Sequence, residues 1–366
     1  MDLEVDRSEL RRTRLTSGRP LPDEPSAGTV LVRIDSFALT ANNVTYGAVG
    51  DLIGYWRFFP AVDDGWGRIP VWGHGEVVAS ACDGVVPGER LYGYWPMSSH
   101  LVLAPVDVRP DGFADGTAHR ADLPPVYNRY SRVPATADGA VDNDAEARRA
   151  LLAPLFATSF LIDAWLADEG MFGATTVVVA SASSKTALGL AHLLQAGEQV
   201  EVVGLTSARN VEFVTASGAY DRVIAYDDVP AGLGDEPAVL VDMSGDAGIR
   251  AAVHTHFGDR LRRSVQVGMT HHDAPAAGNT AGAEQGGLPG PAPEFFYAPD
   301  HIRRRWKEWG PAGYGERLDA ARSGFDAGPG ETISIDHVRG AEAVRAAWVA
   351  TVDGRADPSR GLICGW

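Results

Sequence analysis

A hydroxyl-rich turn between an apolar run and a helical stretch carries the clearest chemical signal in the chain. Residues 175–180 (TTVVVA) are typical of a strand buried on both faces. The turn leads into a predicted helix over 185–196, whose N-terminal amides would face an anion, as in a dinucleotide pyrophosphate site. Ser and Ala replace the usual glycines, so a serine-capped ordinary turn is the alternative. The candidate cofactor-binding residues here are Ser181, Ser183, Ser184, Lys185 and Thr186.

A second signal follows the next predicted strand, over residues 200–204. An NAD site usually has an acidic residue there to hold the ribose hydroxyls, but this chain has Leu205 and then hydroxyls, an arginine and an amide. Without a carboxylate to repel a 2′-phosphate, and with a guanidinium to bind it, the segment favours NADPH over NADH. The candidates are Thr206, Ser207, Arg209 and Asn210. Thr206 or Ser207 could instead cap the following helix, and the two roles are compatible.

Composition narrows the class of protein. The 366 residues include 32 Lys plus Arg and 48 Asp plus Glu, a net charge of −16, which argues against a general nucleic-acid binder and against docking on anionic membranes. Two cysteines, Cys82 and Cys364, cannot form a disulfide framework or a four-cysteine zinc site. We find no secretory signal and no apolar run long enough to span a membrane, so we expect a cytoplasmic protein.

The order of predicted elements places these residues in an α/β chain. The first 110 residues read as all-β, and beyond residue 145 strands alternate with helices, which predicts a parallel sheet with right-handed crossovers. Further strands are expected over 222–225, 238–242, 263–267, 295–297 and 361–365. Further helices are expected over 145–167, 210–217, 248–257, 301–309 and 340–352. The aromatic stretch 52–68 is either core packing or a wall of a substrate cleft, and the small, polar segment 274–292 is either a lid or an insertion.

Three phrases give the chain a family resemblance: FALTANNVTYG at 37–47, VYNRY at 126–130 and VVVASASSKTA at 177–187. They resemble the uncharacterised bacterial DUF2855 family, within the zinc-independent quinone and enoyl reductases of the medium-chain dehydrogenase/reductase superfamily. The resemblance implies a GroES-like β domain (1–144), a Rossmann domain with a doubly wound parallel sheet (145–310) and a C-terminal segment returning to the first domain (311–366), with the active site between the domains. It adds Tyr226, Ser244, Gly268 and Thr270 to the candidate cofactor-binding residues.

The chain departs from the zinc enzymes of that superfamily. Asn42-Asn43 stands in the region of the first cysteine ligand, the Gly-His-Glu motif is altered to Gly73-His74-Gly75-Glu76, and both cysteines lie outside the motif positions. The groups His254-x-His256 and His271-His272-Asp273 lack a convincing third ligand. We therefore expect no catalytic zinc and no other metal.

Without zinc to polarise a carbonyl, reduction of a conjugated C=C is favoured over alcohol oxidation, since it needs only hydride placement and a proton donor. The resemblance gives Tyr46 as a proton donor, with Asn43 and Tyr130 as the other candidate catalytic residues. The alternative for Tyr46 and Tyr130 is packing with a hydrogen-bonded hydroxyl. The leading hypothesis is thus an NADPH-dependent, zinc-independent reductase of an enone, enoyl or quinone-type molecule. A redox-neutral lyase or isomerase and a non-catalytic NADPH-binding protein remain alternatives, and relatives suggest a homodimer joined through the strand at 295–297.

Overall fold

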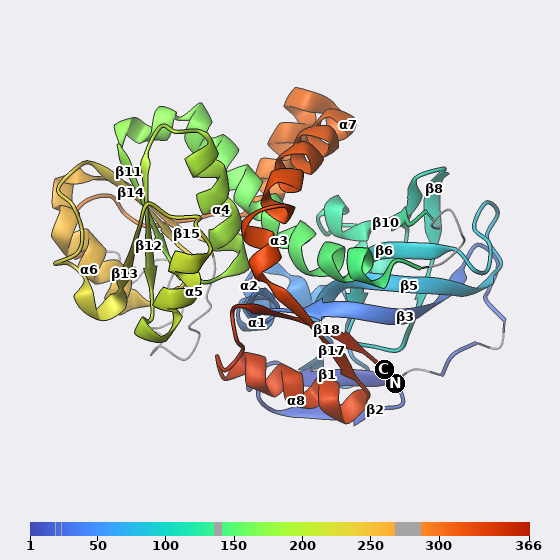
Figure 1. The fold of residues 1–366 in the computed structure, drawn as a ribbon. Coiled ribbons are helices and arrows are strands. Elements are labelled where there is room, and N and C mark those ends of the chain that lie inside the picture. The colour runs from blue at the N-terminus through green and yellow to red at the C-terminus, as the bar shows by residue number, and fades with distance from the viewer. Residues whose placement is uncertain (19, 23, 135–140, 268–286) are drawn as a thin grey trace. The chain divides into compact units, whose positions relative to one another are not determined.

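The computed structural model describes residues 1–366 except 19, 23, 135–140 and 268–286 (Figure 1). The chain divides into two compact units. The first contains Met1–Leu151, Ile335–Ala356 and Arg360–Trp366, and the second contains Leu152–Ser334 and Asp357–Ser359. The return to the first unit thus begins at Ile335, later than the expected residue 311.

A parallel six-stranded sheet forms the centre of the second unit. Its order is β13-β12-β11-β14-β15-β16, and every pairing is parallel. The strands are β11 (Thr176–Ala180), β12 (Glu201–Thr206), β13 (Arg222–Ala225), β14 (Ala238–Asp242), β15 (Leu261–Gln266) and β16 (Glu294–Phe295). The chain enters at β11, winds outward through β12 and β13, and returns to β14 on the other side of β11. This order places the switch point of a doubly wound sheet at the C-terminal end of β11.

Helices α3 (Asn143–Asp168), α4 (Lys185–Ala196), α5 (Val211–Ala216), α6 (Ala247–Phe257) and α7 (Ala298–Asp326) accompany this sheet (Figure 1). Helix α3 is long and apolar enough to cross a membrane by composition, but 56% of that stretch is buried inside the protein, as in the core helix of a soluble domain. Helix α7 continues past the expected end at residue 309, with a kink at Gly310. It stays in the second unit because Phe325 stacks on Phe156 of α3, with ring centroids 5.2 Å apart.

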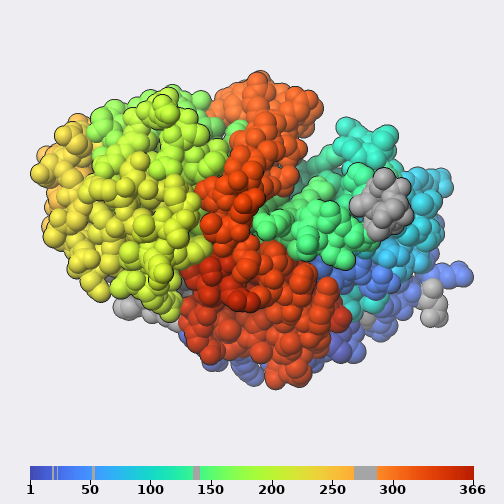
Figure 2. Space-filling model, viewed as in Figure 1, coloured from blue at the N-terminus to red at the C-terminus, as the bar shows by residue number. Residues whose placement is uncertain are grey.

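A mostly antiparallel sheet forms the first unit. Its order is β17-β18-β3-β5-β6-β10-β9-β8, with β7 also pairing β3, and a second sheet has the order β2-β1-β4. The main strands are β3 (Val30–Leu39), β5 (Pro70–Ser80), β6 (Arg90–Pro96), β7 (His100–Leu103), β8 (Pro105–Arg109), β9 (Gly112–Asp115), β10 (Arg129–Arg132), β17 (Ser334–Arg339) and β18 (Arg360–Gly365). The small sheet has β1 (Asp2–Asp6), β2 (Thr13–Thr16) and β4 (Trp66–Gly67). Helix α8 (Ala341–Val352) belongs to the red C-terminal segment that forms part of this unit's surface (Figure 2).

The all-β prediction for the first 110 residues is wrong between β3 and β4. Helices α1 (Ala41–Ala48) and α2 (Gly50–Ile53) occupy that stretch. Helix α1 begins with a capping box, in which the Asn43 Oδ1 accepts from the Thr40 backbone amide at 2.7 Å. The helix then buries Val44 and Tyr46. This short helix depends on its cap and on tertiary packing, because eight residues are too few for a stable isolated helix.

Candidate functional site

The turn after β11 keeps a glycine-like backbone without a glycine. Ser181 has φ 59°, in the left-handed region, which costs a side-chain-bearing residue on the order of 1 kcal/mol or more. Ser184 caps α4 by accepting from the Ala187 amide at 3.2 Å. The Tyr226 hydroxyl accepts the Ser181 amide at 3.0 Å, and burial raises the pKa of that phenol. The predicted strand-turn-helix is therefore confirmed, and one amide of its turn, that of Ser181, is hydrogen-bonded to Tyr226.

Two buried hydroxyls lie at the end of β12. The Thr206 side chain is 1% exposed, and within the described part of the chain neither its hydroxyl nor that of Ser207 has a hydrogen-bond partner. Ser207 precedes a short helix, but its side chain makes no cap. The Asn210 amide instead donates to the Ser183 hydroxyl at 3.1 Å, which links this segment to the turn after β11. Unpartnered buried hydroxyls call for an explanation, and a ligand is one.

A lysine lies at the start of α4. The Lys185 ammonium donates to the Pro358 carbonyl at 3.0 Å, and burial lowers its pKa to about 8 while Asp357 opposes the shift. A cation beside a helix N-terminus is electrostatically unfavourable on its own, but favours a bound anion at the same place. Thr186 contributes its backbone carbonyl, which accepts from the Ser159 hydroxyl at 2.7 Å.

The end of β14 is organised internally. The Ser244 hydroxyl, fully buried, donates to Asp242 Oδ1 at 2.6 Å, and Asp242 Oδ2 pairs with Arg250 at 3.0 Å. Ser244 thus holds the turn beside the switch point. Gly268 and Thr270, the other two predicted cofactor residues, lie outside the described residues.

Tyr46 lies in an aromatic cluster of the first unit. We call it the tyrosine cluster; its buried members are Tyr46, Tyr55, Phe58, Phe59, Tyr94, Leu123 and Tyr127, with Trp72 packed against them. The Asn42 amide donates to the Tyr46 hydroxyl at 2.8 Å, and burial raises the pKa of Tyr46 to about 12. Asn43 does not join this cluster through its polar atoms: besides capping α1, it donates to the Pro70 carbonyl at 2.9 Å.

Tyr130 does not belong to the same site. Its side chain is fully buried in the sheet core, where its hydroxyl donates to the Tyr94 carbonyl at 2.7 Å and accepts from Arg120 at 3.1 Å. The catalytic prediction for Tyr130 is therefore not supported by its position, and the packing alternative describes it. Asn43 is likewise a capping residue. The sequence reasoning missed Tyr94, which the alternation of β6 points to the opposite face from Leu91 and Trp95, and also Asn42, one helical turn from Tyr46.

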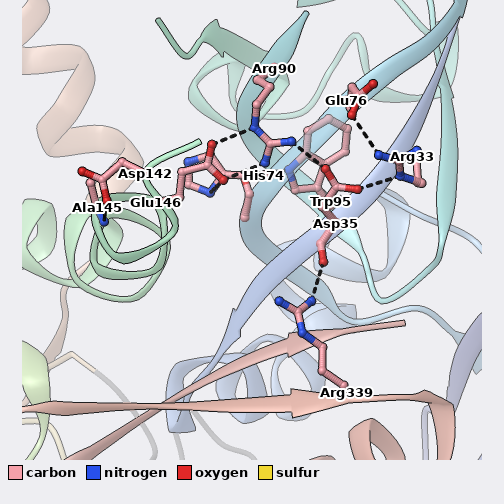
Figure 3. A network of polar contacts seen from close by, with 11 residues as sticks. Arg33, Asp35, His74, Glu76, Arg90, Trp95, Asp142, Ala145, Glu146 and Arg339 are labelled. Carbon is pink, nitrogen blue, oxygen red and sulfur yellow. Dashed lines mark hydrogen bonds and ion pairs between the residues drawn. The ribbon is translucent and has the colours of Figure 1, made fainter. Parts of the chain in front are cut away.

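The altered Gly-His-Gly-Glu motif lies within a network of charged side chains (Figure 3). Arg90 pairs with Glu146 in the first turns of α3 at 2.7 Å and with Asp35 of β3 at 2.7 Å. His74 is fully buried beside this pair, 4.0 Å from Glu146, and neither ring nitrogen finds a hydrogen-bond partner in the described ranges. Burial, together with Arg149 and Arg90, lowers the pKa of His74 to about 3, so its ring is neutral near pH 7.

Within the described residues, no three His, Cys, Asp or Glu side chains gather as they would around a metal. His254 contacts Ser264 and the Pro289 carbonyl, whereas His256 contacts the Gly234 carbonyl. The group 271–273 lies outside the described residues.

The fold has known counterparts among solved structures. CurA from Vibrio vulnificus in complex with NADPH aligns with a TM-score of 0.62 and 14% identity over 96% of this chain and 94% of that one. The CurK enoyl reductase aligns with a TM-score of 0.55 and 12% identity over 100% and 98%. A putative NADPH:quinone reductase from Mesorhizobium loti aligns with a TM-score of 0.53 and 14% identity over 93% and 88%. At these identities the likeness establishes the fold, and it confirms the predicted two-domain α/β class.

The family follows from the sequence itself. The profile of DUF2855, described as a protein family of unknown function, matches residues 37–357, and the chain belongs to this family. Comparison with curated proteins gave no match.

Proposed function

We propose that this protein is an NADPH-dependent, zinc-independent reductase that transfers hydride to an activated C=C of a small conjugated molecule in the cytoplasm. One observation carries the proposal. At the switch point, the left-handed turn at Ser181 and the N-terminus of α4 adjoin a β12 end that has unpartnered buried hydroxyls and no carboxylate. The NADPH complex of CurA, which shares the fold, supports the same choice of cofactor.

The residues present fit this cofactor. The turn 181–184, with Lys185 at the start of α4, would hold the pyrophosphate by backbone amides and one positive charge. Thr206, Ser207 and Arg209 would hold the 2′-phosphate, since a guanidinium binds a phosphate through paired hydrogen bonds. When bound, NADPH supplies the hydride.

In the first unit, Tyr46 would supply the proton. Its pKa of about 12 keeps the phenol protonated near pH 7, and the Asn42 amide already occupies a lone pair of its oxygen. The phenolic proton is therefore directed away from Asn42. A general acid placed in this way contributes on the order of 10²- to 10⁴-fold to a rate.

The test is a titration of the purified protein with NADPH and with NADH, followed by energy transfer from tryptophan. Arg209→Ala should weaken NADPH binding on the order of 10- to 100-fold, because a charge-assisted contact contributes about 1.5–3 kcal/mol, and should leave NADH binding nearly unchanged. Arg303→Ala, which removes an exposed arginine paired with Asp300 on α7, is the matched control. Equal losses for both cofactors would refute the assignment of Arg209.

The hydrogen bond from the Ser181 amide to Tyr226 favours a second candidate, a redox-neutral lyase or isomerase on the same fold. An amide bound to a phenol is not available to a phosphate unless Tyr226 moves. This alternative predicts product formation without NADPH consumption. Stoichiometric NADPH oxidation would exclude both this candidate and a non-catalytic NADPH-binding role.

A further inference from the structure

We propose that the hydroxyls of Tyr94 and Tyr46 together form a donor pair that binds the carbonyl oxygen of the substrate, which makes an α,β-unsaturated ketone or aldehyde the substrate class. The inference rests on the proposed reductase function for its chemistry. The donor pair lies entirely in the first unit, and its test needs no NADPH.

The Tyr94 hydroxyl is the group in this cluster that calls for a ligand. The Tyr94 side chain on β6 is completely buried, and across the described residues its oxygen has no partner with hydrogen-bond geometry. A buried polar group without a partner costs about 1–3 kcal/mol, so native proteins rarely retain one without a function. The adjoining hydroxyls of Tyr46, Tyr55 and Tyr127 add to the burial that raises the pKa of Tyr94, and it remains a protonated donor at neutral pH.

Tyr46 is the second donor because of where α1 places it. Asn42 and Tyr46 are four residues apart and lie on the same face of the helix. The Asn42 amide donates to the Tyr46 oxygen at 2.8 Å, so this oxygen acts there as an acceptor and keeps its own proton for another group. The Tyr46 and Tyr94 rings meet edge to face, with centroids 5.9 Å apart. Asn42 is thus a positioning residue for Tyr46.

The other two phenols of the cluster have a different role. The hydroxyls of Tyr55 and Tyr127 bond to each other at 2.9 Å. The segment that carries Tyr127 is fixed by Arg120, which donates to the Tyr127 carbonyl at 2.8 Å and receives support from Asp115 at 2.9 Å. These contacts hold the Tyr55 ring against Tyr46 and the Tyr127 ring against Tyr94.

The surroundings suit a flat, conjugated ligand. The ring centroid of Trp72 lies 5.0 Å from that of Tyr94, and the ring centroid of Phe58 lies 5.4 Å from it. Aromatic surfaces therefore flank the two hydroxyls. Trp72 and Asn42 are partly exposed, whereas Tyr46 and Tyr94 are buried. A ligand that reaches the donor pair would therefore enter on the side of Trp72 and Asn42 and displace the Trp72 ring.

The proposed reduction adds one hydride and one proton to the substrate. Hydride adds to the β-carbon of the substrate, the C=C electron pair forms a new double bond to the carbonyl carbon, and the carbonyl π pair moves to oxygen. Two hydrogen bonds stabilise the negative charge that develops there, as in an oxyanion hole. Tyr46 passes its proton to that oxygen, the enol becomes the ketone in water, and Tyr46 regains a proton from water. Tyr94 keeps its proton throughout.

The test uses 4-nitrophenol, a planar phenol whose phenolate resembles the enolate and absorbs visible light. Titrations of the whole protein without NADPH, at several pH values, give the affinity for phenol and phenolate. We expect the phenolate to bind on the order of 10-fold more tightly, which lowers the pKa of the bound probe by about one unit. Tyr94→Phe and Tyr46→Phe should each abolish most of this preference, and Tyr55→Phe should retain it.

The outcomes separate the two proposals. Loss of the phenolate preference in Tyr94→Phe, with an unchanged circular dichroism spectrum, supports the donor pair. A wild-type preference in that variant, or no preference in the wild type, overturns it. Failure of NADPH binding while the phenolate preference persists would refute the reductase and leave the carbonyl site in place. NADPH binding with enone turnover unaffected by Tyr94→Phe would do the reverse.

Discussion

Tyr94 and Tyr130 make a matched pair for measuring the cost of a buried phenol. Both side chains are fully buried in the first unit, on the neighbouring strands β6 and β10. The Tyr130 hydroxyl has two partners, the Tyr94 carbonyl at 2.7 Å and Arg120 at 3.1 Å. The Tyr94 hydroxyl lies beside that of Tyr46, but in the described structure it has no partner with hydrogen-bond geometry. Replacing each tyrosine by phenylalanine should therefore change the free energy of unfolding by different amounts.

The magnitudes follow from these partners. Tyr130→Phe loses a neutral bond of about 1 kcal/mol and a bond to a charged donor of about 1.5–3 kcal/mol, so it should destabilise by about 3 kcal/mol. Tyr94→Phe removes an unsatisfied group and leaves only a small void, so it should change stability by about 0 to 1 kcal/mol in the stabilising direction. The midpoint and slope of urea unfolding, followed by tryptophan fluorescence, measure both.

If Tyr94→Phe is destabilised as much as Tyr130→Phe, and the dependence of its unfolding free energy on urea concentration is unchanged, then the Tyr94 hydroxyl has a partner in the folded protein. Tyr94 would then need no ligand to satisfy its hydroxyl. A stabilised Tyr94→Phe would instead be the usual sign of a site kept for function at the expense of stability.

Three further predictions concern other parts of the chain. His74 has a folded pKa of about 3, below its unfolded value of about 6.5, so the unfolded state binds the proton first and stability falls as pH drops from about 6.5 towards 3. Between pH 7 and 5 the free energy of unfolding of the wild type, measured in urea, should fall by about 2 kcal/mol more than that of His74→Gln. Parallel pH profiles of the two proteins would contradict this. Ser181→Gly should raise stability by about 1 kcal/mol in a thermal melt, since glycine tolerates φ 59°, and a loss would show that the serine side chain contributes more than the strain. We also propose a homodimer through the edge strand β16, where Phe295 is 49% exposed; Phe295→Asp should then give a monomer by light scattering, and a monomeric wild type would refute it.

The parallel sheet could be predicted from local sequence patterns. The strands over 222–225 and 238–242 and the helix over 185–196 have the predicted bounds. These elements are readable because continuous β-branched runs and amphipathic stretches follow from local side-chain chemistry. The absence of a carboxylate after β12 is also a property of the sequence alone.

The sequence did not determine α1 or the later return at Ile335. Helix α1 is short, and its stability comes from the Thr40 and Asn43 cap and from burial of Tyr46. The return depends on α7, which is held in the second unit by the contact between Phe325 and Phe156, residues 169 positions apart. Packing between distant segments leaves no periodic signal in either one.

The roles of the tyrosines depend on contacts between distant segments, which the sequence does not reveal. The sequence predicts Tyr46 as the proton donor and Tyr130 as a further catalytic candidate, and it offers Tyr94 only as one residue of an apolar strand. Arg120, from a short helical turn after β9, and the Tyr94 carbonyl of β6 bind the hydroxyl of Tyr130 on β10. The hydroxyl of Tyr94 is left beside that of Tyr46. A phenol's chemistry depends on which groups surround its oxygen, and those neighbours come from segments that only the folded sheet brings together.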